Sequence, residues 1–408
     1  MKKISSRNKA NKEHPERQDS SSPLQLFGVA LKLGLTSFGG PIAHLGYFYD
    51  EYVKRRKWLT DKAYAELVAI SQMLPGPASS QFGIAVGTMR GGISGGVASW
   101  IGFTLPSALI MAAFGMLMHG AGLDPEAGWL HGLKIVAVAI VAHAVLQMGQ
   151  KLAADKIRAT IALTAAFTAL LWDIPAGHII IILAAGIAGV LIFRNLPEET
   201  GTGIKSGLSA NAGVMLLIVF AALLIIFPAL RHLSGNTLAA FADSLYRTGA
   251  LVFGGGHVIL PLLEREVVSP GWVSAGEFLA GYGAAQALPG PLFTFAVYLG
   301  VMKAGPAGAA VALFAIFLPA FLLILGAVPL WSKIRSYEKV RAAVSGINAA
   351  VVGILLAALY NPLWTSSVKG APDFALALLL YGMLAFWKLP PWVIVITGAC
   401  AGALMAVF

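Results

Sequence analysis

Long apolar stretches with almost no Asp, Glu, Lys or Arg constrain this chain more than any other feature. Charged residues make up 12% of its 408 residues and hydrophobic residues 57%. Soluble domains carry roughly 25% charged residues. Several stretches approach the roughly 20 apolar residues that a helix needs to cross a bilayer. The pattern therefore predicts an all-α polytopic membrane protein in the lipid bilayer, and no period-two barrel pattern competes with it.

The remaining charges are mostly basic and lie in the N-terminal segment and in the loops. The net charge is +10, and the polar residues 1–23 contain no apolar signal-peptide core. This segment is predicted to be a basic disordered cytoplasmic tail. No nucleic-acid partner is expected, because the bases are not gathered on one surface. Cys400 is the only cysteine, which excludes an intramolecular disulfide.

The chain repeats itself at an offset near 214 positions. "WLTDKAYAELVAISQMLPGP" (58–77) resembles "WVSAGEFLAGYGAAQALPGP" (272–291), and "LTSFGGPIAHLGYF" (35–48) resembles "ALVFGGGHVILPLL" (250–263). Such self-similarity is typical of a duplication. The predicted parts are the tail 1–23, a membrane repeat 24–195, a linker with one extra helix 196–239, and a second membrane repeat 240–408.

Equivalent loops of the two repeats carry opposite charge. Loop 54–62 has five bases, whereas its partner 264–277 has one base and three acids. Loop 119–130 has no Lys or Arg, whereas 333–341 has four. Because basic loops stay in the cytoplasm, the two repeats are predicted to be inverted in the membrane. Residues 210–230, which have no counterpart, supply the odd crossing that inversion needs.

Hydropathy predicts four further spans in each half and two unusual segments. The spans are 94–118, 131–150, 159–173 and 177–193, then 307–331, 342–360, 372–387 and 391–408. The unusual segments contain FGG (24–49 and 240–263) or LPGP (63–89 and 277–302). These segments are predicted to enter and turn back, or to cross as broken helices. If each of these four segments counts as one element, the eight spans and the extra helix bring the total to about 13 membrane elements. The N-terminus is predicted to be cytoplasmic.

The LPGP segments break a helix in a way that favours anion binding. The first helix should stop near Leu74, Gly76 can adopt the turn, and Pro77 suits the start of a new helix. The unpaired first amides of such a half-helix form an anion site, and paired broken helices mark a transporter's centre. A simple kink or packing device is the alternative. The candidate substrate-binding residues are Gln72, Pro75, Gly76, Pro77, Ser79, Ser80, Gln81, Gln286, Pro289, Gly290, Pro291 and Thr294.

The FGG segments add a second set of candidates, with close helix packing as the alternative. They are Phe38, Gly39, Gly40, Pro41, His44, Phe253, Gly254, Gly255, Gly256 and His257. The coupling or gating candidates are Glu51, Glu264, Glu266, Arg90 and Lys303, for which interfacial capping and snorkelling are the alternatives. Lys134, His143 and Glu66 rank lower because each is unmatched in its repeat. The run Gly91–Gly96 is interpreted as helix packing.

Soluble-enzyme motifs are missing from the sequence. It contains no HExxH, Walker loop, Cys/His metal cluster or GxSxG, so no catalytic residue, metal or cofactor is predicted. The chain is not expected to be an enzyme. Without a nucleotide-binding loop, any transport would not be driven by ATP on this chain.

These paired motifs resemble a known family. "FGGPIAH", "QMLPGP", "FGGGHVILPLLEREVV" and "QALPGP", in two tandem halves, are similar to the long, two-domain form of the chromate ion transporter family. The resemblance covers about residues 24–408. It implies an inner-membrane protein with oppositely oriented halves that exports chromate, shares sites with sulfate and confers chromate resistance.

Several alternatives remain beside the chromate exporter. A transporter of sulfate or another oxyanion would have the same broken helices, and an anion channel would differ in giving ohmic current. A membrane enzyme or assembly factor lacks a catalytic cluster in this sequence. The coupling ion, the stoichiometry and the oligomeric state, a homodimer included, stay open.

Overall fold

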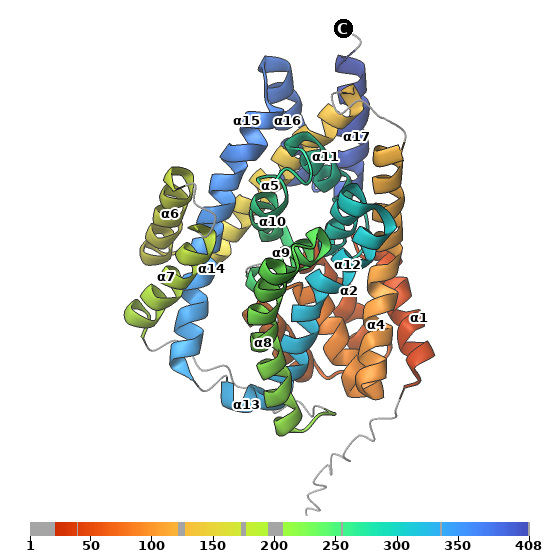
Figure 1. The fold of residues 1–408 in the computed structure, drawn as a ribbon, viewed down its shortest axis with the longest axis vertical. Coiled ribbons are helices and arrows are strands. Elements are labelled where there is room, and N and C mark those ends of the chain that lie inside the picture. The colour runs from red at the N-terminus through yellow and green to blue at the C-terminus, as the bar shows by residue number, and fades with distance from the viewer. Residues whose placement is uncertain are drawn as a thin grey trace, which may run out of the picture.

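The first half of the chain is built from helices. The computed structural model describes residues 21–38, 40–120, 127–172, 177–194, 207–253, 256–334 and 337–406. The α-helices of the first half are α1 (Pro23–Thr36), α2 (Gly40–Phe48), α3 (Asp61–Met73), α4 (Ala78–Gly120), α5 (Gly128–Leu152), α6 (Lys156–Leu171) and α7 (Gly177–Ile192). A π-helical segment, Tyr49–Arg55, extends α2. Figure 1 shows these elements from red to yellow-green.

The second half repeats this order after a single intervening helix, α8 (Ala210–Ser234). Its α-helices are α9 (Thr237–Leu251), α10 (Ile259–Val267), α11 (Ala275–Ala285), α12 (Phe295–Ala327), α13 (Trp331–Ile334), α14 (Glu338–Ala358), α15 (Thr365–Ser367), α16 (Ala371–Ala385) and α17 (Pro391–Met405). Short 3₁₀ turns occupy Gly256–Val258, Leu292–Thr294 and Val328–Leu330, and a π-helical segment occupies Leu359–Trp364.

The prediction of an all-α membrane protein is confirmed. No strand occurs in the described ranges, and five helical stretches are long and apolar enough to span a membrane: Ala78–Gly120, Gly128–Leu152, Ala210–Ser234, Leu292–Leu330 and Glu338–Ser367. The helices α6, α7, α16 and α17 have only 15 or 16 residues. At 1.5 Å per residue each is about 24 Å long, shorter than a bilayer core of about 30 Å. Residues 1–20 of the predicted tail and 195–206 of the predicted linker lie outside the described residues.

Each LPGP segment folds back on itself as a helical hairpin. Trp58 lies just before α3, and the guanidinium of Arg90, thirteen residues into α4, lies 5.2 Å from its ring centre. In the second half, the ammonium of Lys303 lies 4.9 Å from the ring centre of Trp272, just before α11. Both ends of each segment are thus adjacent, and the Pro-Gly-Pro forms the tip. The backbone of each segment therefore reverses direction at its Pro-Gly-Pro, and its path through the membrane stays a prediction.

The FGG segments form two further hairpins of the same kind. The amide of Ser21, before α1, donates to the carbonyl oxygen of Arg90, and Arg56, after the π-helical segment, stacks on Trp58. In the second half, the rings of Phe241, near the start of α9, and Trp272 lie 5.5 Å apart. The ends of all four hairpins therefore gather around Trp58 or Trp272.

A sharp reversal follows each LPGP hairpin, within helices that are otherwise continuous. The backbone of α4 leaves helical geometry at Gly91 and Gly92, where φ of Gly92 is +65°. After this turn the chain runs back along itself, since a Cβ on Gly87 would lie 2.4 Å from the carbonyl oxygen of Gly95. The helix α12 turns in the same way at Gly305, whose φ is +60°. The run Gly91–Gly96 therefore forms the turn, in addition to allowing the close helix packing that the sequence predicts.

The two halves interlock through matched helix contacts. A Cβ on Gly132 of α5 would lie 2.0 Å from the carbonyl oxygen of Gly398 of α17, and one on Gly346 of α14 would lie 2.2 Å from that of Ala185 of α7. Gly132 and Gly346 are equivalent in the repeat. Each half thus packs its long helix against the short helix pair of the other half, as Figure 1 shows for α14 beside α6 and α7.

Candidate functional site

The Pro-Gly-Pro breaks have the geometry that the sequence predicts. The helix α3 ends at Leu74, which is extended (φ −79°, ψ 147°), and α4 begins at Ala78. Gly76 has φ +117° and Gly290 has φ +93°, values that L side chains rarely adopt. In the second half, α12 is preceded by the 3₁₀ turn Leu292–Thr294. Proline removes a donor at each break, so the helix cannot continue through it.

The tips of the hairpins bind across the two halves. The amide of Gly76 donates to the carbonyl oxygen of Val252, at the end of α9, over 2.7 Å. The amide of Gly290 donates to the carbonyl oxygen of Ser37, at the end of α1, over 2.9 Å. Ser37 and Val252 directly precede the two FGG motifs. Both glycine amides are therefore occupied by protein acceptors, and they hold the LPGP tip of one half to the FGG tip of the other.

The first LPGP tip carries a buried polar cluster. The Nδ1 of His44 lies 2.9 Å from the Oγ of Ser79. Gln81 donates from Nε2 to the carbonyl oxygen of Pro75 over 2.8 Å, so this side chain supports the break itself. The Oγ of Ser80 and the Nε2 of His44 are buried and have no hydrogen-bond partner in the described part of the chain. The first half thus places unused polar atoms at the start of α4.

The second LPGP tip is arranged differently. Thr294, the counterpart of Ser80, donates from its hydroxyl to the carbonyl oxygen of Pro291 over 2.9 Å. The Nδ1 of His257 lies 3.0 Å from the hydroxyl oxygen of Tyr282. The Nε2 of Gln286 is buried without a hydrogen-bond partner among the described residues. Gln72, its counterpart in the first half, is exposed, so the repeated glutamines lie in different environments.

A cavity of about 340 Å³ lies beside the second tip and is lined by both halves. Four predicted residues meet there: Gly40, His257, Gln286 and Gly290. His143 of α5, a lower-ranked candidate from the sequence, also lines it, as do two polar residues that are not among the candidates: Gln147 of α5 and Lys388 of the turn between α16 and α17. None of the described lining residues is Asp or Glu. The cavity therefore offers one formal positive charge and several neutral hydrogen-bonding groups.

The other predicted site residues lie outside this lining. Phe38 and Phe253 are partly buried and Gly256 is buried in its 3₁₀ turn. Gly39, Gly254 and Gly255 lie outside the described residues, and Pro41 is described only as part of α2. Pro75, Pro77, Pro289 and Pro291 shape the breaks. The sequence offers one signal for Lys388, because "WDIP" (172–175) and "WKLP" (387–390) resemble each other at an offset of 215, within one position of the repeat offset.

The coupling candidates Glu51 and Glu266 form equivalent ion pairs away from the cavity. Glu51, which is 4% exposed, accepts from Lys32 over 2.7 Å and also pairs with Arg55 and Arg56. Glu266 accepts from Arg247 over 3.1 Å. Lys32 lies on α1 and Arg247 on α9, the helices that precede the two FGG motifs. In the structure His44 thus contacts Ser79, whereas Glu51 pairs with bases of α1 and of its own segment.

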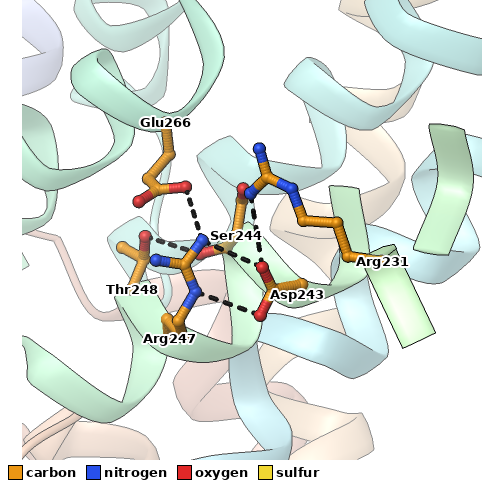
Figure 2. A network of polar contacts seen from close by, with 6 residues as sticks. All are labelled: Arg231, Asp243, Ser244, Arg247, Thr248 and Glu266. Atoms are coloured by element: carbon orange, nitrogen blue, oxygen red, sulfur yellow. Dashed lines mark hydrogen bonds and ion pairs between the residues drawn. The ribbon is translucent and has the colours of Figure 1, made fainter. Parts of the chain in front are cut away.

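The second of these pairs belongs to a larger network (Figure 2). Arg247 donates to both carboxylate oxygens of Asp243, at 3.0 and 2.9 Å, and Arg231 at the end of α8 reaches the same carboxylate at 3.3 Å. Asp243 is only 1% exposed. The network joins α8, α9 and α10, and its contacts indicate a structural role. Arg90 and Lys303, which stack on Trp58 and Trp272, likewise hold hairpin ends together.

Comparisons with known proteins agree on one family. A family model described as "Chromate transporter" matches residues 24–190 and again 239–403. A "Chromate transport protein" of Pseudomonas aeruginosa is 30% identical over 81% of this chain and 79% of its own length. A "Probable chromate transport protein" of Synechococcus elongatus is 30% identical over 93% and 95%. A "Chromate transport protein" of Cupriavidus metallidurans is 28% identical over 94% and 92%. No solved structure matches.

Proposed function

The chain belongs to the chromate transporter family, and on this premise we propose that it is a secondary transporter that exports chromate across the inner membrane. Three relatives named for chromate transport support the substrate. The site is inferred from the geometry, export from the membrane potential, and chromate resistance from the family resemblance. Sulfate, a tetrahedral dianion like chromate, is the competing substrate.

The cavity between the hairpin tips carries this proposal. It touches Gly40 of the first half and Gly290 of the second, so it lies where the two repeats meet. Transporters with repeated halves bind their substrate at such an interface. The Nε2 of Gln286 is a buried donor there without a hydrogen-bond partner in the described ranges, and such a group is costly unless something accepts from it. A tetrahedral oxyanion with four acceptor oxygens would satisfy it.

Alternating access would move this site between the two sides of the membrane. We place the halves in opposite orientations, for which the reversed loop charges and the matched tips of the hairpins are the support. In the present conformation the cavity lies beside Gln286 and Gly290, whereas His44, Ser79 and Ser80 are buried at the first tip. The unpartnered atoms of this cluster would line the path that opens in the alternate conformation.

The membrane potential alone could drive export. Each elementary charge that crosses 100 mV is worth about 2.3 kcal/mol, so a dianion gains about 4.6 kcal/mol when it leaves a cell whose interior is negative. This energy supports an outward concentration ratio on the order of a thousandfold. The potential would therefore be sufficient without ATP, and coupling to protons or to sulfate would add to it.

Uptake of radiolabelled chromate and sulfate into inverted membrane vesicles tests the proposal. Chromate uptake should saturate, should rise when the vesicle lumen is made positive, and should be inhibited by sulfate. Vesicles without the protein provide the control. Absence of chromate uptake with sulfate uptake intact would assign the chain to sulfate instead, and ohmic current in a planar bilayer would show a channel.

A further inference from the structure

Lys388 differs from the other described residues of the cavity lining in its charge. It is the one formally charged side chain among the described residues that line the cavity. It lies in the turn between α16 and α17, where the amide of Leu389 donates back to the carbonyl oxygen of Met383 over 3.0 Å and closes the end of α16. Lys388 is exposed, so its side chain lies at the accessible edge of the cavity. An anion that enters would meet this charge.

The backbone at Lys388 is unfavourable for lysine. Its φ is +53°, in the left-handed region where a Cβ is crowded by the following carbonyl oxygen. Glycine is the usual residue just beyond the end of a helix for this reason. Lysine thus occupies a position whose backbone conformation favours glycine, and its place in the cavity lining distinguishes it from a second lysine in the same conformation. Lys57 provides an internal comparison, since it also has φ +53° and is exposed, but it does not line the cavity.

The groups around Lys388 complete a site for an oxyanion. The Nε2 of Gln286 is a buried donor to which no described residue offers an acceptor, and the Nε2 atoms of Gln147 and His143 lie 2.8 Å apart on α5. These groups are uncharged donors or acceptors, except where a histidine is protonated, and no carboxylate faces them from the described lining. The lysine therefore supplies the charge, and its neighbours supply hydrogen bonds. In the first repeat the aligned sequence position holds an acid, Asp173, so the cation is specific to the second half.

We propose that Lys388 makes the cavity select doubly charged over singly charged tetrahedral oxyanions. This inference rests on the proposed function, in which the cavity holds the transported oxyanion. At a given distance and dielectric constant, the attraction between an ammonium and a dianion is twice that between an ammonium and a monoanion. Loss of the charge should therefore weaken dianion binding more than monoanion binding. A change in the shape of the turn would weaken both.

Variants at Lys388 and Lys57 distinguish the effect of losing the positive charge from the effect of relieving the left-handed backbone conformation. In inverted vesicles, Lys388→Gln should raise the KM for chromate about tenfold or more with little change in the maximal rate, and Lys388→Arg should restore it. Lys388→Gly should show the same rise while the purified protein unfolds at the same or a higher temperature. Lys57→Gly relieves the same backbone conformation, so it should keep the wild-type KM.

Selectivity between dianions and monoanions distinguishes a role of Lys388 in anion recognition from a role in folding. Inhibition of chromate uptake by sulfate, a dianion, should weaken in Lys388→Gln by about threefold more than inhibition by perchlorate, a monoanion of the same shape, because halving the charge halves the lost attraction. Equal weakening of both, or a wild-type KM in Lys388→Gln, would overturn the inference. If the wild-type protein takes up no chromate, the proposed function fails. The rise in melting temperature that sulfate gives the purified protein then still tests Lys388, because the inference requires a smaller rise in Lys388→Gln and fails if the rise is unchanged.

Discussion

The backbone amide of Gly76 donates to the carbonyl oxygen of Val252 over 2.7 Å, and this bond joins the first LPGP tip to the second FGG tip. Its counterpart joins Gly290 to Ser37 over 2.9 Å. The helix breaks therefore have a role that an isolated kink would not have. They allow each tip to bind the other half where the two repeats meet, and the cavity lies directly beside the second bond.

Substitution of Gly76 by alanine should disable transport while the protein still inserts. Its φ of +117° disfavours any side chain, and a Cβ would lie 3.1 Å from the Nε2 of Gln81. The strain should cost about 1–2 kcal/mol. Chromate uptake and the melting temperature of the purified protein measure the two effects. Gly46→Ala, where a Cβ meets nothing within 4 Å, should keep the wild-type uptake and melting temperature. If Gly76→Ala behaved like Gly46→Ala, the role of the tip would be contradicted.

Opposite orientation of the halves predicts opposite labelling of two exposed loops. Cysteines at Lys54 and Ser269, placed one at a time in a Cys400→Ser background, should react with an impermeant maleimide from opposite sides of the membrane. Lys54 should be cytoplasmic, because its loop is rich in bases. Right-side-out and inverted vesicles provide the comparison. Labelling of both positions from the same side would refute the inversion.

Removal of Arg247 should unfold the region around α9. Arg247→Ala leaves the buried carboxylate of Asp243 with only the longer contact from Arg231 at 3.3 Å. Breaking a buried ion pair from one side typically costs about 3–5 kcal/mol. The melting temperature and the yield of folded protein in detergent measure this loss. Lys54→Ala removes an exposed pair with Asp50, so it should change stability by no more than about 1 kcal/mol, and a similar loss there would contradict the argument.

Ser80 and Thr294 should respond differently although they occupy equivalent positions. The hydroxyl of Ser80 has no partner among the described residues, so Ser80→Ala should keep the stability while lowering the rate of chromate uptake. The hydroxyl of Thr294 is bonded to Pro291, so Thr294→Val should cost about 1 kcal/mol of stability. Uptake and thermal unfolding distinguish them. Full transport by Ser80→Ala would remove this residue from the proposed path.

The candidate site was predictable where a local pattern repeats and unpredictable where distant segments meet. Proline and glycine at 75–77 and 289–291 predict the two breaks, and both occur. The same pattern predicts that Gly76 adopts the turn, but only packing shows that the amides of Gly76 and Gly290 donate to carbonyl oxygens of the other half. The glutamines Gln72 and Gln286 match in sequence, yet only Gln286 reaches the cavity.

The sequence by itself determined that this chain is a duplicated helical membrane protein with a helix break in each half. These properties follow from charge-free apolar stretches and from residues that cannot continue a helix, so they depend only on near neighbours in the chain. The tertiary structure alone decided that Gly40, His143, Gln286 and Lys388 line one cavity, because the two halves interlock and bring together turns that are far apart in sequence. Backbone propensity sets where a chain bends, whereas the packing of helices against each other sets which bends meet.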